Sequence, residues 1–96
     1  MRIAIDGARI GSQADLHRVL AGHLDFGPYY GHNLNALRDR LSRDVERPLE
    51  IIWENAAVSR GRMGDEAFEA LASVLVRAAA EDESNAANER LTVRFT

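Results

Sequence analysis

The sequence of 96 residues contains no cysteine, no lysine and no long run of apolar residues. The lack of cysteine excludes disulfide scaffolds, thiolate metal sites and cysteine nucleophiles. The lack of lysine excludes glycine-rich phosphate-binding loops that end in Lys-Ser or Lys-Thr. A membrane helix needs about 20 apolar residues, so we expect no contact with a membrane. An acid, Asp6, follows the N-terminus closely, so we expect no secretory signal and predict a cytoplasmic protein.

The residues that are present have the composition of an ordinary globular protein. Hydrophobic residues make up 46% of the chain and charged residues 28%, which excludes a disordered or fibrous chain. The length fits one domain, which we place over residues 1–96. All twelve basic residues are arginines, a bias that we attribute to a GC-rich bacterial genome. The net charge of −3 argues against a nucleic-acid partner, because neutralisation of phosphates dominates such affinity.

The spacing of hydrophobic residues predicts an alternation of strands and helices. Apolar residues at every second position, or a short run of β-forming residues that is apolar on both faces, predict strands, and apolar residues at every third or fourth position predict helices. The predicted strands are residues 3–5, 49–54 and 91–96, and the predicted helices are residues 13–24, 33–43 and 65–80. We interpret residues 55–64 as a loop with room for one helical turn, followed by Asp65 as a helix cap. Because helices join successive strands, we predict an α/β fold with a small three-stranded parallel sheet packed by helices.

The helix predicted over residues 33–43 has two different faces. Asn33 is a suitable N-cap for it. Its buried stripe consists of three leucines, Leu34, Leu37 and Leu41. Its outward sector carries polar and charged residues, namely Asn35, Arg38, Asp39, Ser42 and Arg43. Because acids are interleaved with the arginines here, a solvated mixed face and a protein interface are both open interpretations of this sector.

The segment before this helix is rich in glycine and aromatic residues. Residues 25–32 contain two glycines and a proline, which excludes regular structure. Two adjacent tyrosines cannot both enter the core unless the loop folds inward, and tyrosine is frequent among the residues that dominate interface energies. We therefore predict that Tyr29 is exposed at an interface and that Tyr30 is packed beneath the loop. Trp53, the only tryptophan, is predicted to lie at the end of the central strand against the long helix.

The three histidines do not indicate a metal site or a catalytic base. His17 and His23 are six residues apart on one predicted helix, which is not the spacing of a helical zinc pair. We interpret them as surface or half-buried side chains, and nothing near His32 in the sequence orients it as a base. No serine or cysteine nucleophile stands in a recognisable turn. We therefore expect no enzyme activity, no metal and no cofactor.

Residues 29–39 read Tyr-Tyr-Gly-His-Asn-Leu-Asn-Ala-Leu-Arg-Asp, a long and chemically unusual motif. With Ile5-Asp6-Gly7 and Asp15-Leu16-His17, it resembles the barstar family of intracellular ribonuclease inhibitors. The likeness covers residues 1–53 and continues as a loop, a long helix and a final strand. The resemblance implies a three-stranded parallel sheet packed by helices. It also implies a protein partner, a bacterial extracellular-type ribonuclease or a nuclease toxin, bound one to one.

The resemblance further implies a binding site. The second helix and the Tyr-Tyr-Gly loop are expected to insert into the RNA groove of the enzyme. There, Asp39 takes the place of an RNA phosphate and Tyr29 lies over the catalytic histidine. The implied ribonuclease-binding residues are Tyr29, Gly31, Asn33, Leu34, Asn35, Arg38, Asp39, Ser42, Arg43 and Val45. The alternative is an interaction module of the same fold that binds another protein without inhibiting a ribonuclease.

Three positions depart from the family pattern. Asn35 stands where the family has an acid, and Arg38 stands where it has a tryptophan. The family's late-helix glutamate falls near Ala78, which leaves Glu81 or Asp82 as candidates to replace it. These departures make the binding face less acidic than is usual in the family. We therefore expect a target whose active site is cationic but whose rim carries acids that face the arginines of this helix.

Overall fold

Three parallel strands form one sheet in the computed structural model, which describes residues 1–96. The strands are β1 (Arg2–Asp6), β2 (Leu49–Glu54) and β3 (Leu91–Phe95). The central strand β2 pairs with both others, so that Ile51 lies opposite Ile3 on one side and opposite Val93 on the other. The predicted α/β class and the three-stranded parallel sheet are therefore confirmed.

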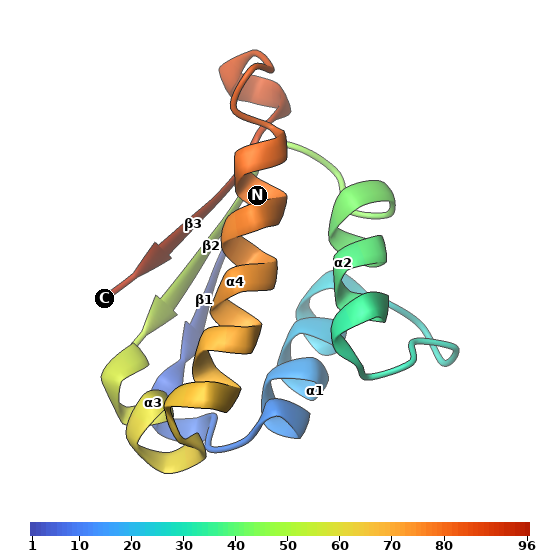
Figure 1. The fold of residues 1–96 in the computed structure, drawn as a ribbon. Coiled ribbons are helices and arrows are strands. Elements are labelled where there is room, and N and C mark those ends of the chain that lie inside the picture. The colour runs from blue at the N-terminus through green and yellow to red at the C-terminus, as the bar shows by residue number, and fades with distance from the viewer.

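Four α-helices and two short 3-10 helices connect the strands. They are η1 (Gly7–Arg9), α1 (Gln13–Leu24), α2 (Leu34–Arg43), α3 (Ala56–Met63), α4 (Asp65–Glu81) and η2 (Ala87–Glu89). The long helix α4 lies across the strands, α1 and α2 lie on one side of it, and β3 is the outermost strand on the other side (Figure 1). The helices predicted over residues 13–24, 33–43 and 65–80 are thus confirmed to within a residue or two.

The expectation of a loop over residues 55–64 is wrong, because the eight residues of α3 form a helix there. Asn55 turns the chain with a φ of 53° after β2 ends. The buried Ser59 then anchors the helix, since its hydroxyl donates to the carbonyl of Gly7 at 2.9 Å and accepts from Trp53 Nε1 at 3.1 Å. Low helix propensity at Ser59 and Gly61 hid this helix from sequence analysis, and tertiary contacts stabilise it.

The first residues of α2 and α4 test the two N-caps that the sequence predicts. The side chain of Asn33 accepts a hydrogen bond from the N–H of Ala36 at 2.8 Å, so its predicted capping role for α2 is confirmed. The expectation that Asp65 caps α4 is wrong, since Asp65 is the first residue inside the helix and Gly64 is the cap. Gly64 has a φ of 92°, a conformation that glycine adopts at little cost.

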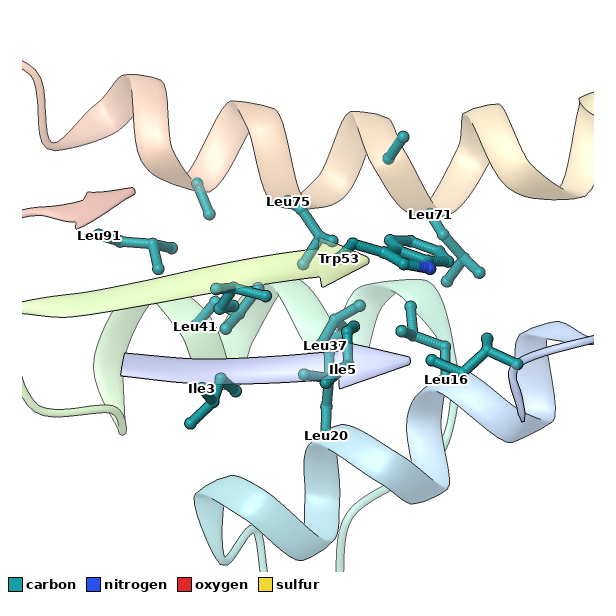
Figure 2. Close-up of a cluster of buried hydrophobic side chains, with 14 of the residues drawn as sticks. Ile3, Ile5, Leu16, Leu20, Leu37, Leu41, Trp53, Leu71, Leu75 and Leu91 are labelled. Atoms are coloured by element: carbon teal, nitrogen blue, oxygen red, sulfur yellow. The ribbon is translucent and has the colours of Figure 1, made fainter. Parts of the chain in front are cut away.

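The hydrophobic core lies between one face of the sheet and the helices (Figure 2). Trp53 is fully buried in it and its ring lies 5.1 Å from the ring of Phe68 in α4, which confirms the predicted place of the tryptophan. Ile3 and Ile5 of β1 point into the same core. Alternate residues of β1 on the opposite face are exposed, which shows that the helices cover only one face of the sheet.

Candidate functional site on helix α2

The loop that precedes α2 places its two tyrosines in opposite environments. Asp25 ends α1 in the left-handed conformation, with a φ of 53°, and the chain then leaves the helix through Gly27, whose φ is 78°. Tyr29 is 91% exposed, whereas Tyr30 is only 5% exposed. The Tyr30 ring lies 4.8 Å from that of the buried Phe26. The predicted exposure of Tyr29 and burial of Tyr30 are confirmed, and the interface role of Tyr29 stays a prediction.

Tyr30 is anchored from below by a histidine of α1. Its hydroxyl and Nδ1 of His17 are joined by a hydrogen bond of 2.6 Å, and both groups are buried. The interpretation of His17 as a surface or half-buried residue is therefore wrong, because its ring is 2% exposed. Its spacing on α1 from Leu16 and Leu20 did not reveal a partner that lies 13 residues away. His32 adds a third ring at 4.9 Å from the Tyr30 ring.

Burial favours the uncharged form of both side chains in this hydrogen bond. Removal from water lowers the pKa of His17, and the neighbouring His32 lowers it further. Burial raises the pKa of Tyr30 to about 12, although the positive charge of Arg40 opposes the shift. Both groups are therefore neutral at pH 7, and the loop rests on an uncharged hydrogen-bonded pair.

Gly31 and Asn33 make a tight junction between the loop and α2. The amide of Asn33 donates to the carbonyl of Gly31 at 3.3 Å while its side-chain oxygen caps the helix. A Cβ atom on Gly31 would lie 3.1 Å from that amide nitrogen and 3.4 Å from the Cβ of Ala36. The absence of a side chain at Gly31 thus permits the close turn that fixes Tyr29 relative to α2.

The outward face of α2 brings together most of the residues predicted for the site. Five of them are exposed, namely Asn35, Arg38, Asp39, Ser42 and Arg43. Leu34 is half-buried rather than buried, so it contributes both to the core and to this surface, as does Val45 after the helix. We call this surface, together with Tyr29, the α2 face. Its helix is held from behind by the fully buried Leu37 and Leu41.

The carboxylate of Asp39 is exposed and takes part in none of the ion pairs or side-chain hydrogen bonds of the chain. Arg38 and Arg43 of the α2 face are likewise without an ion pair. An unpaired charge held on a rigid, capped helix can bind an oppositely charged partner with little loss of conformational entropy.

The other two arginines of this region have structural roles. Arg40 pairs with Asp44 at 3.7 Å on the same helix. Arg47 is largely buried, and its guanidinium donates to the carboxylate of Asp82 at 2.8 Å and to the carbonyl of Leu41 at 2.7 Å. The peptide bond from Arg47 to Pro48 is cis. Arg38 and Arg43 are thus free of ion pairs, whereas Arg40 and Arg47 pair with acids of the chain.

A groove of about 320 Å³ separates α2 from α4. Arg38 lines it from α2 and Arg77 lines it from α4, with Leu34 and Val74 among its apolar residues. Ala78 is buried at this groove, so no acid stands at that position. Of the two candidates to replace it, Asp82 is committed to Arg47, whereas Glu81 is exposed and accepts from the Ser42 hydroxyl at 3.5 Å. Sequence analysis missed Arg77, because nothing in its spacing places it opposite Arg38.

Two further structural findings bear on the kind of site. No three histidine, cysteine, aspartate or glutamate side chains gather closely enough to hold a metal ion. No helix combines the length and the apolar character that crossing a membrane requires. The α2 face offers charged, polar and aromatic groups on an outward helix surface.

Comparison with known proteins identifies the family. The chain matches the family described as Barstar (barnase inhibitor) over residues 1–95. The chain belongs to the barstar family. A curated relative in Bacillus subtilis (strain 168), named "Putative ribonuclease inhibitor YrdF", is 39% identical over 70 residues, which are 73% of this chain and 77% of that protein. The barstar match extends past residue 53, where sequence analysis found only a matching order of elements.

Proposed function

We propose that this barstar-family chain inhibits a bacterial extracellular-type ribonuclease or nuclease toxin in the cytoplasm of the cell that makes the enzyme. The α2 face enters the active site as a one-to-one plug, with α2 and the loop around Tyr29 in contact with the enzyme. Asp39 stands in for a phosphate of the RNA, and Tyr29 covers the catalytic histidine. Family membership supports the inhibitor role, and the relative's printed name agrees with it.

The observation that carries this mechanism is the unpaired, exposed carboxylate of Asp39 on the rigid helix α2. A ribonuclease binds the phosphates of RNA with cationic side chains in a cleft. A carboxylate that enters such a cleft forms charge-assisted hydrogen bonds, which are about twice as strong as neutral ones. Because no group of this chain satisfies Asp39, binding to the enzyme does not require an internal ion pair to break first.

The test measures RNA cleavage by barnase, and by any nuclease encoded beside the chain's own gene, with and without an equimolar amount of the protein. We expect full inhibition of one of these enzymes. The Asp39→Ala variant should lose at least about 2 kcal/mol of binding free energy, which is a factor of tens in the inhibition constant. Its melting temperature should not change. As a matched control, Glu89→Ala removes the same charge from η2 and should inhibit like the wild type.

The possible outcomes separate the two candidate functions. A stable complex that leaves RNA cleavage intact would favour the interaction module over the inhibitor. Wild-type inhibition that Asp39→Ala does not weaken would remove the phosphate-substitute role while leaving inhibition in place. Absence of both binding and inhibition with either enzyme would overturn the proposal.

The charges around Asp39 further point to a target with acids on its rim. Arg38 and Arg43 flank Asp39 without ion pairs, and Arg77 shares the groove with Arg38. On a strongly basic enzyme these arginines would meet like charges, whereas arginine pairs well with carboxylates. The cationic active site of the target would then attract Asp39, while acids on its rim would attract Arg38 and Arg43. We therefore expect association rates to depend only mildly on salt.

Stopped-flow association rates across a salt series test this charge arrangement. Arg38→Glu should slow association with the true target, and Arg9→Glu, a charge reversal in η1 outside the α2 face, should leave the rate almost unchanged. A steep fall in the wild-type rate with added salt, or faster association of Arg38→Glu, would show that the rim of the target is basic.

A further inference from the structure

The strand β3 forms the outer edge of the sheet, on the side away from α2 (Figure 1). Two hollows share Val76: one of about 290 Å³ lies between α4 and β3, and one of about 410 Å³ lies among α3, α4 and the end of β3. Val76 is 49% exposed and Phe95 is 37% exposed, and both line the larger hollow, so their apolar surface is gathered in one place. We call the surface formed by Val76, Ala79, Ala80, Val93 and Phe95 the β3 strip.

The backbone of β3 carries free hydrogen-bonding groups along the same strip. In a parallel ladder, alternate residues of a strand bond to the neighbour on one side. The carbonyl of Arg90 accepts from Leu49 and the N–H of Thr96 donates to Trp53, so the even-numbered residues bond to β2. The N–H and carbonyl groups of Val93 and Phe95 therefore point away from the sheet. An open edge of this kind is a template for another strand.

We propose that a second copy of this chain docks on the β3 strip by antiparallel pairing of the two β3 strands. A two-fold axis at Val93 lets this residue exchange two hydrogen bonds with Val93 of the second copy. The N–H of each Phe95 then donates to the Leu91 carbonyl across the axis, which gives four backbone hydrogen bonds in all. The N–H of Leu91 is already bonded to Asp82 at 2.7 Å, so the ladder ends there.

The charges at the two ends of the strip favour a second copy over an unrelated strand. Glu83 and Arg90 line the hollow near the start of β3, and Arg60 and Glu69 line the one near its end. Antiparallel pairing brings the start of one strand to the end of the other. Glu83 and Arg90, which have no ion pair in the chain, then come to lie beside Arg60 and Glu69 of the second copy, which are paired with each other. Each end carries one acid and one base, so the arrangement is complementary to itself.

The side chains near the axis fit the same arrangement. Val76 lines both hollows and therefore lies near the middle of the strip, where a two-fold axis places it near its own counterpart. Arg94 points to the open face of the sheet and falls opposite Thr92 of the second copy, so the two Arg94 side chains do not face each other. Pairing would remove the exposed apolar surface of Val76 and Phe95 from water. It would also leave the α2 face of both copies open.

The test measures the molar mass of the full chain by sedimentation velocity over about a hundredfold range of concentration. We expect a shift from one chain to two. Val76→Glu places a charge at the axis and should weaken association at least about tenfold. Val58→Glu is the matched control, because Val58 is a valine of similar exposure, 44%, on the surface of α3, and it should associate like the wild type.

Hydrogen exchange identifies the surface that pairs. The amides of Val93 and Phe95 should become protected as concentration rises in the wild type and in Val58→Glu, but not in Val76→Glu. A wild type that stays a single chain throughout the range would overturn the proposal, as would dimers of Val76→Glu as stable as those of the wild type. Protection of these amides only on addition of another protein would assign the strip to a foreign strand instead.

Discussion

Among residues 26–43, the side chains that point into the core and those that point to solvent have different surroundings. On the inward side, Phe26, Tyr30 and Leu37 are almost fully buried, and the hydroxyl of Tyr30 is bonded to His17. On the outward side, Tyr29 and Asp39 are exposed and Asp39 has no internal partner. Adjacent residues of one segment thus contribute differently. The inward side chains pack in the core, and the outward side chains are exposed to solvent, where a partner can contact them.

Because the two sets of side chains have different surroundings, we expect stability and binding to be separable in this chain. Removal of an inward side chain leaves a cavity or an unpaired polar group, both of which lower the free energy of unfolding. Removal of an outward side chain changes only what a partner meets. Pairs of variants at neighbouring positions can therefore test the division, because each pair shares its helix or loop and differs only in direction.

The largest expected contrast is between Leu37 and Arg38 on α2. Leu37→Ala should lower the free energy of unfolding by about 2–5 kcal/mol, because Leu37 is fully buried. Arg38→Ala should change it by no more than about 0.5 kcal/mol. Chemical denaturation followed by Trp53 fluorescence measures both, since native emission from the buried Trp53 should be blue-shifted and move to the red on unfolding. Equal losses in the two variants would contradict the division.

A smaller contrast is expected between the two tyrosines. Tyr30→Phe removes the partner of His17 Nδ1 and should cost about 1–3 kcal/mol of stability. Tyr29→Phe should not affect the melting temperature, and Tyr29→Ala should weaken ribonuclease binding without unfolding the protein. Thermal melting and inhibition assays on these variants are the measurements. Reversal of the two effects would mean that the loop is turned the other way.

The smallest expected effect is a pH dependence of stability that comes from the inward pair. His17 has an ordinary pKa of 6.5, and burial lowers its pKa in the folded state, so stability should fall as the pH drops below 6.5. Tyr30 has an ordinary pKa of 10.0, and burial raises its pKa to about 12, so stability should also fall as the pH rises between these values. Each group contributes at most about 1.4 kcal/mol per pH unit.

Unfolding free energies measured from pH 5 to pH 11 check this dependence. Tyr30→Phe should lose the alkaline part of the profile, whereas Tyr29→Phe should keep it, because only Tyr30 is buried. An alkaline fall of equal size in the wild type and in Tyr30→Phe would show that another group is responsible.

Some features of the core and of the site could be predicted from the sequence, and others could not. The stripe Leu37 and Leu41, the cap Asn33 and the burial of Trp53 follow from spacing and local chemistry, and the structure confirms them. The helix α3 could not be predicted, because its anchor is the contact of Ser59 with a residue 52 positions away. The partnership of His17 with Tyr30 is invisible for the same reason.

Residue spacing and one local motif were enough to predict the three strands, the helices α1, α2 and α4, the two faces of α2 and the resemblance to the family, because periodicity and a local motif are properties of neighbouring residues. Tertiary structure alone decided which charges are free and which are committed. It assigned Arg47 and Asp82 to each other, left Asp39 and Arg38 unpaired, and placed Arg77 opposite Arg38 across a groove. Arg47 and Asp82, like Arg38 and Arg77, are far apart in the chain, and the packing of α2 against α4 brings these segments together.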